Sequence, residues 1–463
     1  MPALALILIS ILVLILLRIE HKQYSAGSYS LWIPTIWIMI CGSRPIGRWF
    51  ETVTIDNETG SPIDQAVLII LLILALLICS KRKIQRSTIL KDNLWLVLLF
   101  IYMALSILWS DFPFVCFKRW MRVSGSLLMG TLILTENQPR QALESVLRRC
   151  SYVLLPFSLM LVKYFPHFGR RYGRWDGLEM WTGVATHKNT LGQLCMISII
   201  FLFLAILLRV KSGNLFRCNS PIYADLLVFV IAVFLLKGPG GTTYSATSLA
   251  ITILSIGIIY VLNRYKNLAI FVGSNLIILL VSFALFYILF SEAIIETVAD
   301  ILSRDKNLTG RTIDIWPVVL DAAYRNPILG VGYASAWGLG QKISALATVE
   351  QAHNGYLDIF LQLGIVGVAL LVTFLFSFCN KIRKEVNNNL QWGAFGISIL
   401  VASLIYNNSE SSFIEYTSYL WNIMVYMSIV YSAPYLLDQE NGLETRRSSK
   451  QMFRYKVIQS PFR

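Results

Sequence analysis

Residues 354–378 read NGYLDIFLQLGIVGVALLVTFLFSF, an apolar run with a single charged residue that is long enough to cross a bilayer as a helix. About thirteen such runs follow one another along the chain: 3–17, 28–42, 63–79, 93–109, 115–134, 150–165, 188–208, 222–237, 243–262, 267–290, 354–378, 392–408 and 415–433. Lipid offers backbone N–H and C=O groups no partner, so each run must bond internally as a helix. The first run is short enough to lie at the interface. The sequence therefore predicts an all-α polytopic membrane protein with about 12–13 transmembrane helices.

The composition supports a membrane protein and excludes several other classes. Apolar residues are 56% of the chain and charged residues only 14%, against about 25% charged residues in soluble domains. The net charge of +14 does not indicate nucleic-acid binding, because the Lys and Arg residues are spread through inter-helix loops and the tail. The seven cysteines lie in or beside apolar runs without a CxxC motif, which is typical of buried thiols.

The basic clusters predict the orientation of the chain. If every run crosses, these clusters fall on one side: 81–83, 148–149, 209–211, 264–266, 381–384 and 446–463. Lys and Arg are enriched in cytoplasmic loops, so that side is expected to be cytoplasmic. The sequence thus predicts one transmembrane bundle over 1–433 and a basic cytoplasmic tail over 434–463. Thirteen crossings place the N-terminus outside, and twelve place both ends inside.

The longest polar interruption, 291–353, is predicted to be an external loop. It ends at the string Ala352-His353, and the string RDKNLTGR occupies 304–311 within it. A short helix is expected from about Thr312 to Tyr324, with Pro317 in its first turn. Its apolar face would consist of Ile315, Trp316, Val319, Leu320 and Ala323.

Arg311 and His353 are the candidates for chemistry in this loop. An arginine at a helix start can bind an anion with its guanidinium and the free backbone N–H groups. Lipid-headgroup contact or loop fixation is the alternative interpretation of Arg311. An imidazole with a pKa near 6.5 can accept a proton from a hydroxyl at neutral pH. A helix-capping role at the interface is the alternative for His353.

A second polar string precedes the seventh run, with His187, Lys188 and Asn189 at its centre. It follows a cluster of arginines, Arg170, Arg171 and Arg174, that is interleaved with aromatic residues. These groups suit a phosphate- or sugar-binding shelf. Helix capping and the aromatic belt of membrane proteins explain the same residues.

A third string, Gly238 to Ser248, ends in the small residues Ser245-Ala246-Thr247-Ser248. Small residues favour close helix packing, and a hydroxyl-lined external turn is the functional alternative.

Cations also gather on the predicted outer side, where the orientation rule does not expect them. They lie around 166–189, in the long loop and at 118–122. An anionic ligand on that side would account for these cations. No P-loop, DxD or HExxH motif occurs, which leaves ATP-driven transport and metal-dependent use of nucleotide sugars unsupported. Nor is a pair of carboxylates placed for glycoside hydrolysis.

Taken together, the strings resemble the O-antigen ligase and polysaccharide polymerase superfamily, most closely its exopolysaccharide-production branch of repeat-unit polymerases. The resemblance rests on five strings in order over roughly 90–425: 181–192, 245–248, 304–316, 326–333 and 352–358. It implies a transmembrane-type glycosyltransferase fold in the bacterial cytoplasmic (inner) membrane, with the active face periplasmic or external. It also implies an undecaprenyl-pyrophosphate-linked glycan as donor and a glycan as acceptor, with no cofactor or metal. A flippase and a chain-length regulator are the protein partners that it implies.

By the same resemblance, Arg311 and one arginine of the 170–174 cluster hold the pyrophosphate, and His353 deprotonates the acceptor hydroxyl. The residues assigned to substrate binding are Arg304, Asp305, Arg170, Arg174, His187, Lys188, Asn189 and Asn354. The predicted function is polymerisation of lipid-linked repeat units. Two alternatives stay open: a ligase that transfers lipid-linked glycan to lipid A–core, and a transporter or flippase of a lipid-linked sugar.

Overall fold

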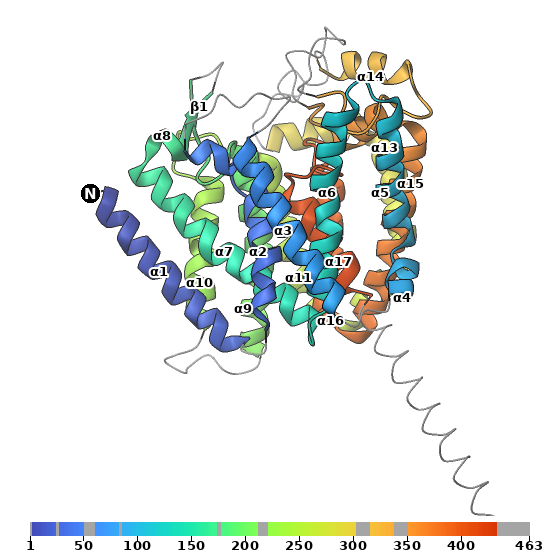
Figure 1. The fold of residues 1–463 in the computed structure, drawn as a ribbon. Helices are drawn as coiled ribbons and strands as arrows, with labels where there is room; N and C mark the ends of the chain where they lie inside the picture. The colour runs from blue at the N-terminus through green and yellow to red at the C-terminus, as the bar shows by residue number, and fades with distance from the viewer. Residues whose placement is uncertain are drawn as a thin grey trace, which may run out of the picture.

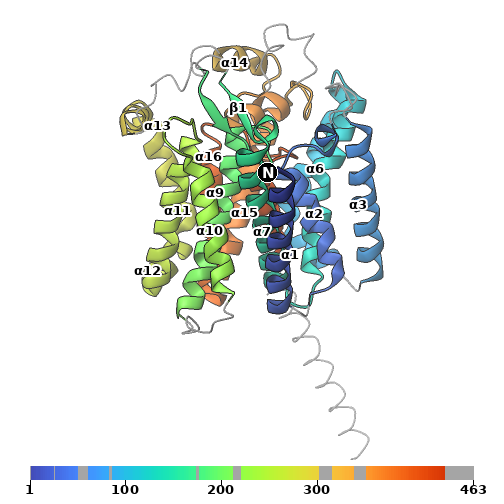
Figure 2. The same cartoon turned by 90° about the vertical axis from the view of Figure 1, so that its left-hand side faces the viewer.

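The computed structural model describes residues 2–24, 27–50, 61–82, 86–173, 177–211, 221–301, 315–337 and 351–432. The predicted all-α architecture is confirmed, since the regular secondary structure of the described residues is helical apart from one small two-stranded sheet (Figures 1 and 2). Each of the predicted apolar runs overlaps a helix or a pair of helices.

The first half of the chain contains α1 (Pro2–Gln23), α2 (Trp32–Cys41), α3 (Pro62–Lys81), α4 (Arg86–Asp92), α5 (Leu94–Leu105), α6 (Pro113–Leu134), α7 (Pro139–Tyr164) and α8 (Pro166–Gly169). Three 3₁₀ turns accompany them: η1 (Tyr29–Leu31), η2 (Ile46–Trp49) and η3 (Ser106–Trp109). The antiparallel strands β1 (Arg170–Tyr172) and β2 (Glu179–Trp181) follow.

The second half contains α9 (Lys188–Lys211), α10 (Ile222–Lys237), α11 (Ala246–Arg264), α12 (Lys266–Ser274), α13 (Leu276–Ile301), α14 (Trp316–Tyr324), α15 (Gly355–Asn388), α16 (Leu390–Tyr406) and α17 (Tyr419–Val430). Of these, α14 is the short helix that the sequence predicts in the long loop. Pro317 lies in its first turn, and Val319 and Ala323 are buried against α15.

Six of the described helices are long and apolar enough to cross a membrane: α1, α3, α7, α9, α11 and α15. A seventh span results if α12 and Leu276–Phe290, which meet at an angle of 72°, count as one. Four shorter apolar helical segments accompany them. The chain is a multi-pass membrane protein, and the exact number of crossings stays a prediction.

The helices divide into a buried centre and an apolar periphery. Every residue of α17 is buried, and so is most of α9 and α16. By contrast, α1 and α3 expose leucine and isoleucine side chains along most of their length. An outward-facing apolar surface is expected where helices meet lipid tails.

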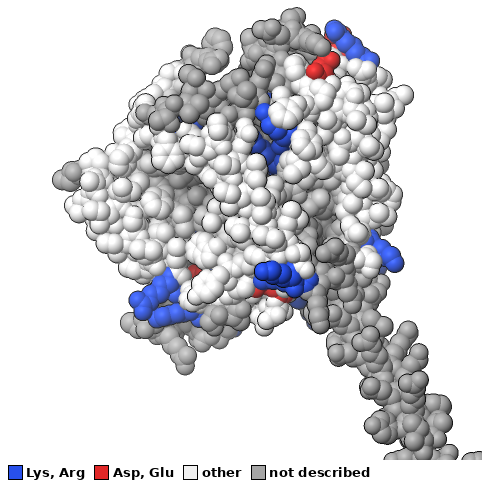
Figure 3. Space-filling model, viewed as in Figure 1, with Lys and Arg blue, Asp and Glu red and all other residues white. Residues whose placement is uncertain are grey.

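The two ends of the bundle differ in structure and in charge. The upper end in Figure 1 holds α8, β1, β2 and α14. Figure 3 shows Lys and Arg side chains in several groups toward the lower end, in one group in the upper part of this face, and at the upper edge beside acidic side chains. The several groups toward the lower end fit the predicted orientation, but which end faces the cytoplasm stays a prediction.

One predicted loop cluster lies inside a helix instead. The sequence predicts Arg148 and Arg149 in a loop because the apolar run begins at residue 150, but α7 begins at Pro139 and buries both. Arg149 Nε lies 2.8 Å from Glu20 Oε2 on α1, and Arg148 Nε lies 3.1 Å from Asp225 Oδ1 on α10. The helix can start early because carboxylates from two other helices compensate the buried charges.

We expect Asp225→Ala to destabilise the bundle by about 3–5 kcal/mol, because it leaves Arg148 with only the partly exposed Glu144 as a partner. Thermal unfolding in detergent measures the effect. Asp321→Ala is the matched control, since its ion pair with Arg325 is 70% and 69% exposed and should contribute little. Equal unfolding temperatures for the two variants would contradict a stabilising role for the buried network.

Candidate functional site

His353 stands directly before α15 and has a carboxylate partner. Its Nδ1 atom lies 3.1 Å from Oε2 of Glu410, which is 6% exposed in the loop between α16 and α17. Gln351 Nε2 lies 3.2 Å from the same ring nitrogen. The backbone of His353 has a φ of 52°, a left-handed conformation that non-glycine residues seldom adopt. The imidazole is thus held by its Nδ1 side.

Asp358, in the first turn of α15, holds the residues next to His353 and Glu410. Asp358 Oδ1 accepts a hydrogen bond from Ala352 N at 3.2 Å, and Oδ2 accepts one from the Ser411 hydroxyl. Trp316 Nε1, at the start of α14, donates to Ala352 O at 3.1 Å. One carboxylate therefore positions both the residue before His353 and the residue after Glu410.

Asn354 caps α15. Its Oδ1 atom accepts hydrogen bonds from Tyr356 N at 3.0 Å and Leu357 N at 3.2 Å. This is the ordinary role of asparagine at a helix N-terminus. The expected contact between Asn354 and substrate stays a prediction.

Gly355 is needed because Asn407 packs directly against it. A Cβ atom at position 355 would lie 2.0 Å from Asn407 Oδ1. That oxygen accepts hydrogen bonds from Ser412 N at 2.9 Å and Phe413 N at 3.0 Å, which hold the turn after Glu410. The His353-Asn354-Gly355 string therefore combines a partnered imidazole, a helix cap and a close packing contact.

The second polar string meets His353 at Glu410. Asn189, in the first turn of α9, donates from Nδ2 to Glu410 Oε1 at 2.5 Å, so the carboxylate joins residues from three separate helix ends. The backbone N–H of Asn189 donates to His187 Nδ1 at 3.3 Å. Burial lowers the pKa of His187, against the opposing effect of Glu410, and Lys188 lowers it further. We therefore expect His187 to be neutral at pH 7.

The third string packs closely against α9, as the small residues predict. A Cβ at Gly192 would lie 2.6 Å from Ser245 Cβ and 2.9 Å from Ser248 Oγ. The Thr247 hydroxyl also lies 2.9 Å from the Ser409 hydroxyl, next to Glu410. This contact connects the start of α11 to the site.

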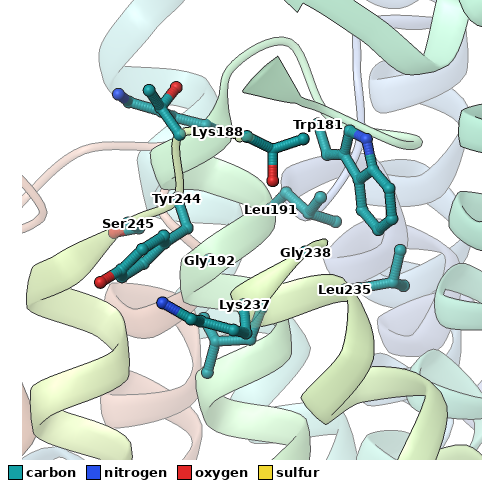
Figure 4. Close-up of a pocket in the computed structure, with 12 residues that line it drawn as sticks. Trp181, Lys188, Leu191, Gly192, Leu235, Lys237, Gly238, Tyr244 and Ser245 are labelled. Carbon is teal, nitrogen blue, oxygen red and sulfur yellow. The ribbon is translucent and has the colours of Figure 1, made fainter. Parts of the chain in front are cut away.

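A small open pocket lies between β2, the start of α9 and the turn from α10 to α11 (Figure 4). Trp181, Lys188 and Tyr244 line it, and the ammonium group of Lys237 lies 3.9 Å from the centre of the Tyr244 ring. The pocket combines cations, hydroxyls and aromatic faces.

The arginines of the 170–174 cluster differ in what they contact. Arg170 donates to Val162 O at 2.7 Å and pairs with Glu179 Oε2 at 3.2 Å. Arg171 follows it in β1, and successive strand residues point to opposite faces. Arg171 is exposed, and its charge acts on His187. Arg174 lies outside the described residues, as do Arg304, Asp305 and Arg311.

The cations at the start of α6 also divide by their contacts. Arg119 donates to Ala334 O at 2.6 Å and to Trp337 O at 2.8 Å, and so fixes the segment after α14. Arg122 lies 5.3 Å from the centre of the Tyr416 ring. Both side chains support loops around the site.

Sequence reasoning missed Glu410. A weak signal exists, because it is the single acidic residue in the polar segment NNSESS, 407–412, between two apolar runs. The segment is predicted to lie on the same side as the long loop. Nothing in the sequence pairs it with a histidine 57 positions earlier.

Comparisons with known proteins agree with this architecture. Residues 226–372 match a family model described as O-antigen ligase, which spans α10 to the middle of α15 and includes His353. The predicted resemblance is confirmed, and the chain is a membrane enzyme of polysaccharide biosynthesis of the glycosyltransferase-like ligase and polymerase type. It is 23% identical over 327 residues to the exopolysaccharide production protein ExoQ of Rhizobium meliloti (strain 1021), covering 66% of this chain and 70% of that protein.

We expect Gly355→Ala to abolish polysaccharide production, because the added methyl group displaces Asn407 and the turn that carries Glu410. Gly257→Ala on α11 is the matched control, since its Cβ would meet no atom within 4 Å. Surface polysaccharide and membrane abundance are measured for both variants. Normal polymer from Gly355→Ala would show that the loop tolerates this displacement.

Proposed function

We propose that the chain polymerises undecaprenyl-pyrophosphate-linked oligosaccharide repeat units into extracellular polysaccharide at the outer face of the bacterial cytoplasmic membrane. The observation that carries the proposal is the meeting of His353, Glu410 and Asn189 at one end of the bundle. The likeness to a protein of exopolysaccharide production favours a polymerase over a ligase.

The contact between His353 and Glu410 supports a general-base role. With Nδ1–H donating to the carboxylate, Nε2 carries the lone pair and can accept a proton. The acceptor hydroxyl gives its proton to Nε2 as its oxygen bonds to the anomeric carbon of the donor. The bond from that carbon to the pyrophosphate oxygen breaks, and the electron pair leaves with the lipid pyrophosphate. Glu410 stabilises the imidazolium that forms.

Arginines neutralise the charge that develops on the leaving pyrophosphate. We assign this role to Arg311 and Arg171. Arg171 is favoured over Arg170 because the guanidinium of Arg170 is already bonded to Glu179 and Val162 O. Arg171 is also the arginine whose charge acts on His187.

The other assignments concern substrate binding. Lys188 and the neutral His187 offer a cation and a hydrogen-bonding imidazole beside the reacting groups. Asn189 acts through its hydrogen bond to Glu410. Arg304, Asp305, Arg174 and Asn354 stay proposed contacts to the donor or acceptor glycan.

The first test is a deletion strain complemented with wild type or with His353→Ala. We expect the variant to accumulate single repeat units on lipid and to make no long polymer, because no group then takes the acceptor proton. The lipid-linked glycan pool and the surface polysaccharide are measured together. Normal polymer from His353→Ala would remove the base assignment. Long lipid-linked polymer in the deletion strain would indicate a ligase, and units trapped on the cytoplasmic leaflet would indicate a flippase.

The second test replaces Arg171 and Arg311 with lysine, which keeps the charge and loses the two-pronged contact to phosphate. We expect each change to lower the polymerisation rate about tenfold or more, since a hydrogen bond to a charged group contributes about 1.5–3 kcal/mol. Arg325→Lys, directly after α14 and exposed at the surface, is the control. A wild-type rate for Arg311→Lys would reject the pyrophosphate role of that residue, and the same holds for Arg171→Lys.

A further inference from the structure

Arg44, in the turn between α2 and η2, donates hydrogen bonds to the backbone carbonyls of residues 183–185 and of Phe168. Its Nη2 atom donates to Phe168 O at 2.5 Å, Gly183 O at 2.9 Å and Ala185 O at 3.0 Å. Its Nε atom donates to Val184 O at 3.3 Å, and its backbone N–H donates to the same oxygen at 2.8 Å. Three consecutive carbonyl groups thus converge on one residue.

The guanidinium is enclosed by aromatic rings. Its central carbon lies 4.6 Å from the centre of the Trp49 ring and 5.5 Å from that of Phe168. Burial, followed by the nearby charges of Arg171 and Arg48, lowers the pKa of Arg44 to about 10. At neutral pH the side chain is still protonated, so backbone carbonyl dipoles and ring faces stabilise a full positive charge.

The stretch that Arg44 binds leads directly into the site. Gly183 to Ala185 precede the string His187-Lys188-Asn189, and Asn189 holds Glu410. From the other side, the Ser158 hydroxyl accepts a hydrogen bond from Val184 N at 3.2 Å. The position of Asn189 therefore follows from where 183–185 is held.

We propose that Arg44 is a positioning residue for glycosyl transfer: its guanidinium fixes the carbonyls of 183–185 so that Asn189 is held against Glu410 and His353. The rate measurements that test this inference rest on the proposed function. Lysine cannot replace the arginine. The planar guanidinium reaches several carbonyls with Nε and Nη2, whereas a single ammonium group cannot reach all of them.

A double-mutant cycle tests the proposal. Arg44→Lys, Asn189→Ala and the double variant of the full chain are compared in lipid nanodiscs with lipid-linked repeat units. We expect Arg44→Lys to lower kcat about tenfold with little change in KM. In the Asn189→Ala background, the same change should cost less than about twofold, because the connection to Glu410 is already lost. Equal losses in both backgrounds, or a wild-type kcat for Arg44→Lys, would overturn the proposal.

Arg48→Lys is the matched control, because Arg48 lies four residues away with an exposed side chain. Its kcat should equal that of wild type. A loss as large as that of Arg44→Lys would indicate a general effect of charge in this turn and would also overturn the proposal.

A labelling experiment separates this proposal from the proposed function. Thr186→Cys is introduced together with Cys218→Ser, since the cysteines in the described part of the chain are buried. We expect Arg44→Lys to speed the reaction of Cys at position 186 with a membrane-impermeant maleimide at least about fivefold, and Arg48→Lys to leave it unchanged. If the chain with Arg44 makes no polymer but Arg44→Lys still speeds labelling, the polymerase function is rejected and the positioning role of Arg44 is retained. Unchanged labelling would reject the positioning role even where polymer is made.

Discussion

The candidate site depends on the carboxylate of Glu410, which contacts two other helix ends. One oxygen lies by His353 Nδ1 and the other accepts from Asn189, so three helix ends meet at a single side chain. Burying a carboxylate is unfavourable unless hydrogen bonds compensate for the lost water. Because Glu410 is buried, both contacts compensate for the water that its carboxylate has lost. A change that removes either contact is expected to disturb the other.

Charges are used differently at different depths of the bundle. Arg148 and Arg149 lie well inside α7 and are paired with carboxylates on other helices. Near the site, Arg44 and Arg119 instead donate to backbone carbonyls and fix loops. A buried ion pair joins helices, whereas an arginine that donates to backbone carbonyls shapes a loop.

The sequence predicted the helices well and the site only in part. The helices follow from apolar runs, because lipid excludes other backbone conformations. Composition alone missed the early start of α7, since paired charges there interrupt the apolar pattern. His353 was singled out by its place between loop and membrane. Glu410 was missed because the pairing is long-range, and Arg44 because its partners are backbone carbonyls, which every residue possesses.

Backbone strain marks the same end of the molecule. Within the described residues, three non-glycine residues have positive φ: Ala334, His353 and Ile414. Each such conformation costs about 1–3 kcal/mol and persists only where neighbours enforce it. Ala334 O accepts from Arg119, Ile414 O accepts from Tyr333 OH, and the segment at His353 is held by Asp358. Every strained residue thus has a side chain that secures it. If His353 is the base that we propose, strain held in this way would fix the imidazole before substrate binds, so that binding energy need not be spent on ordering the loop.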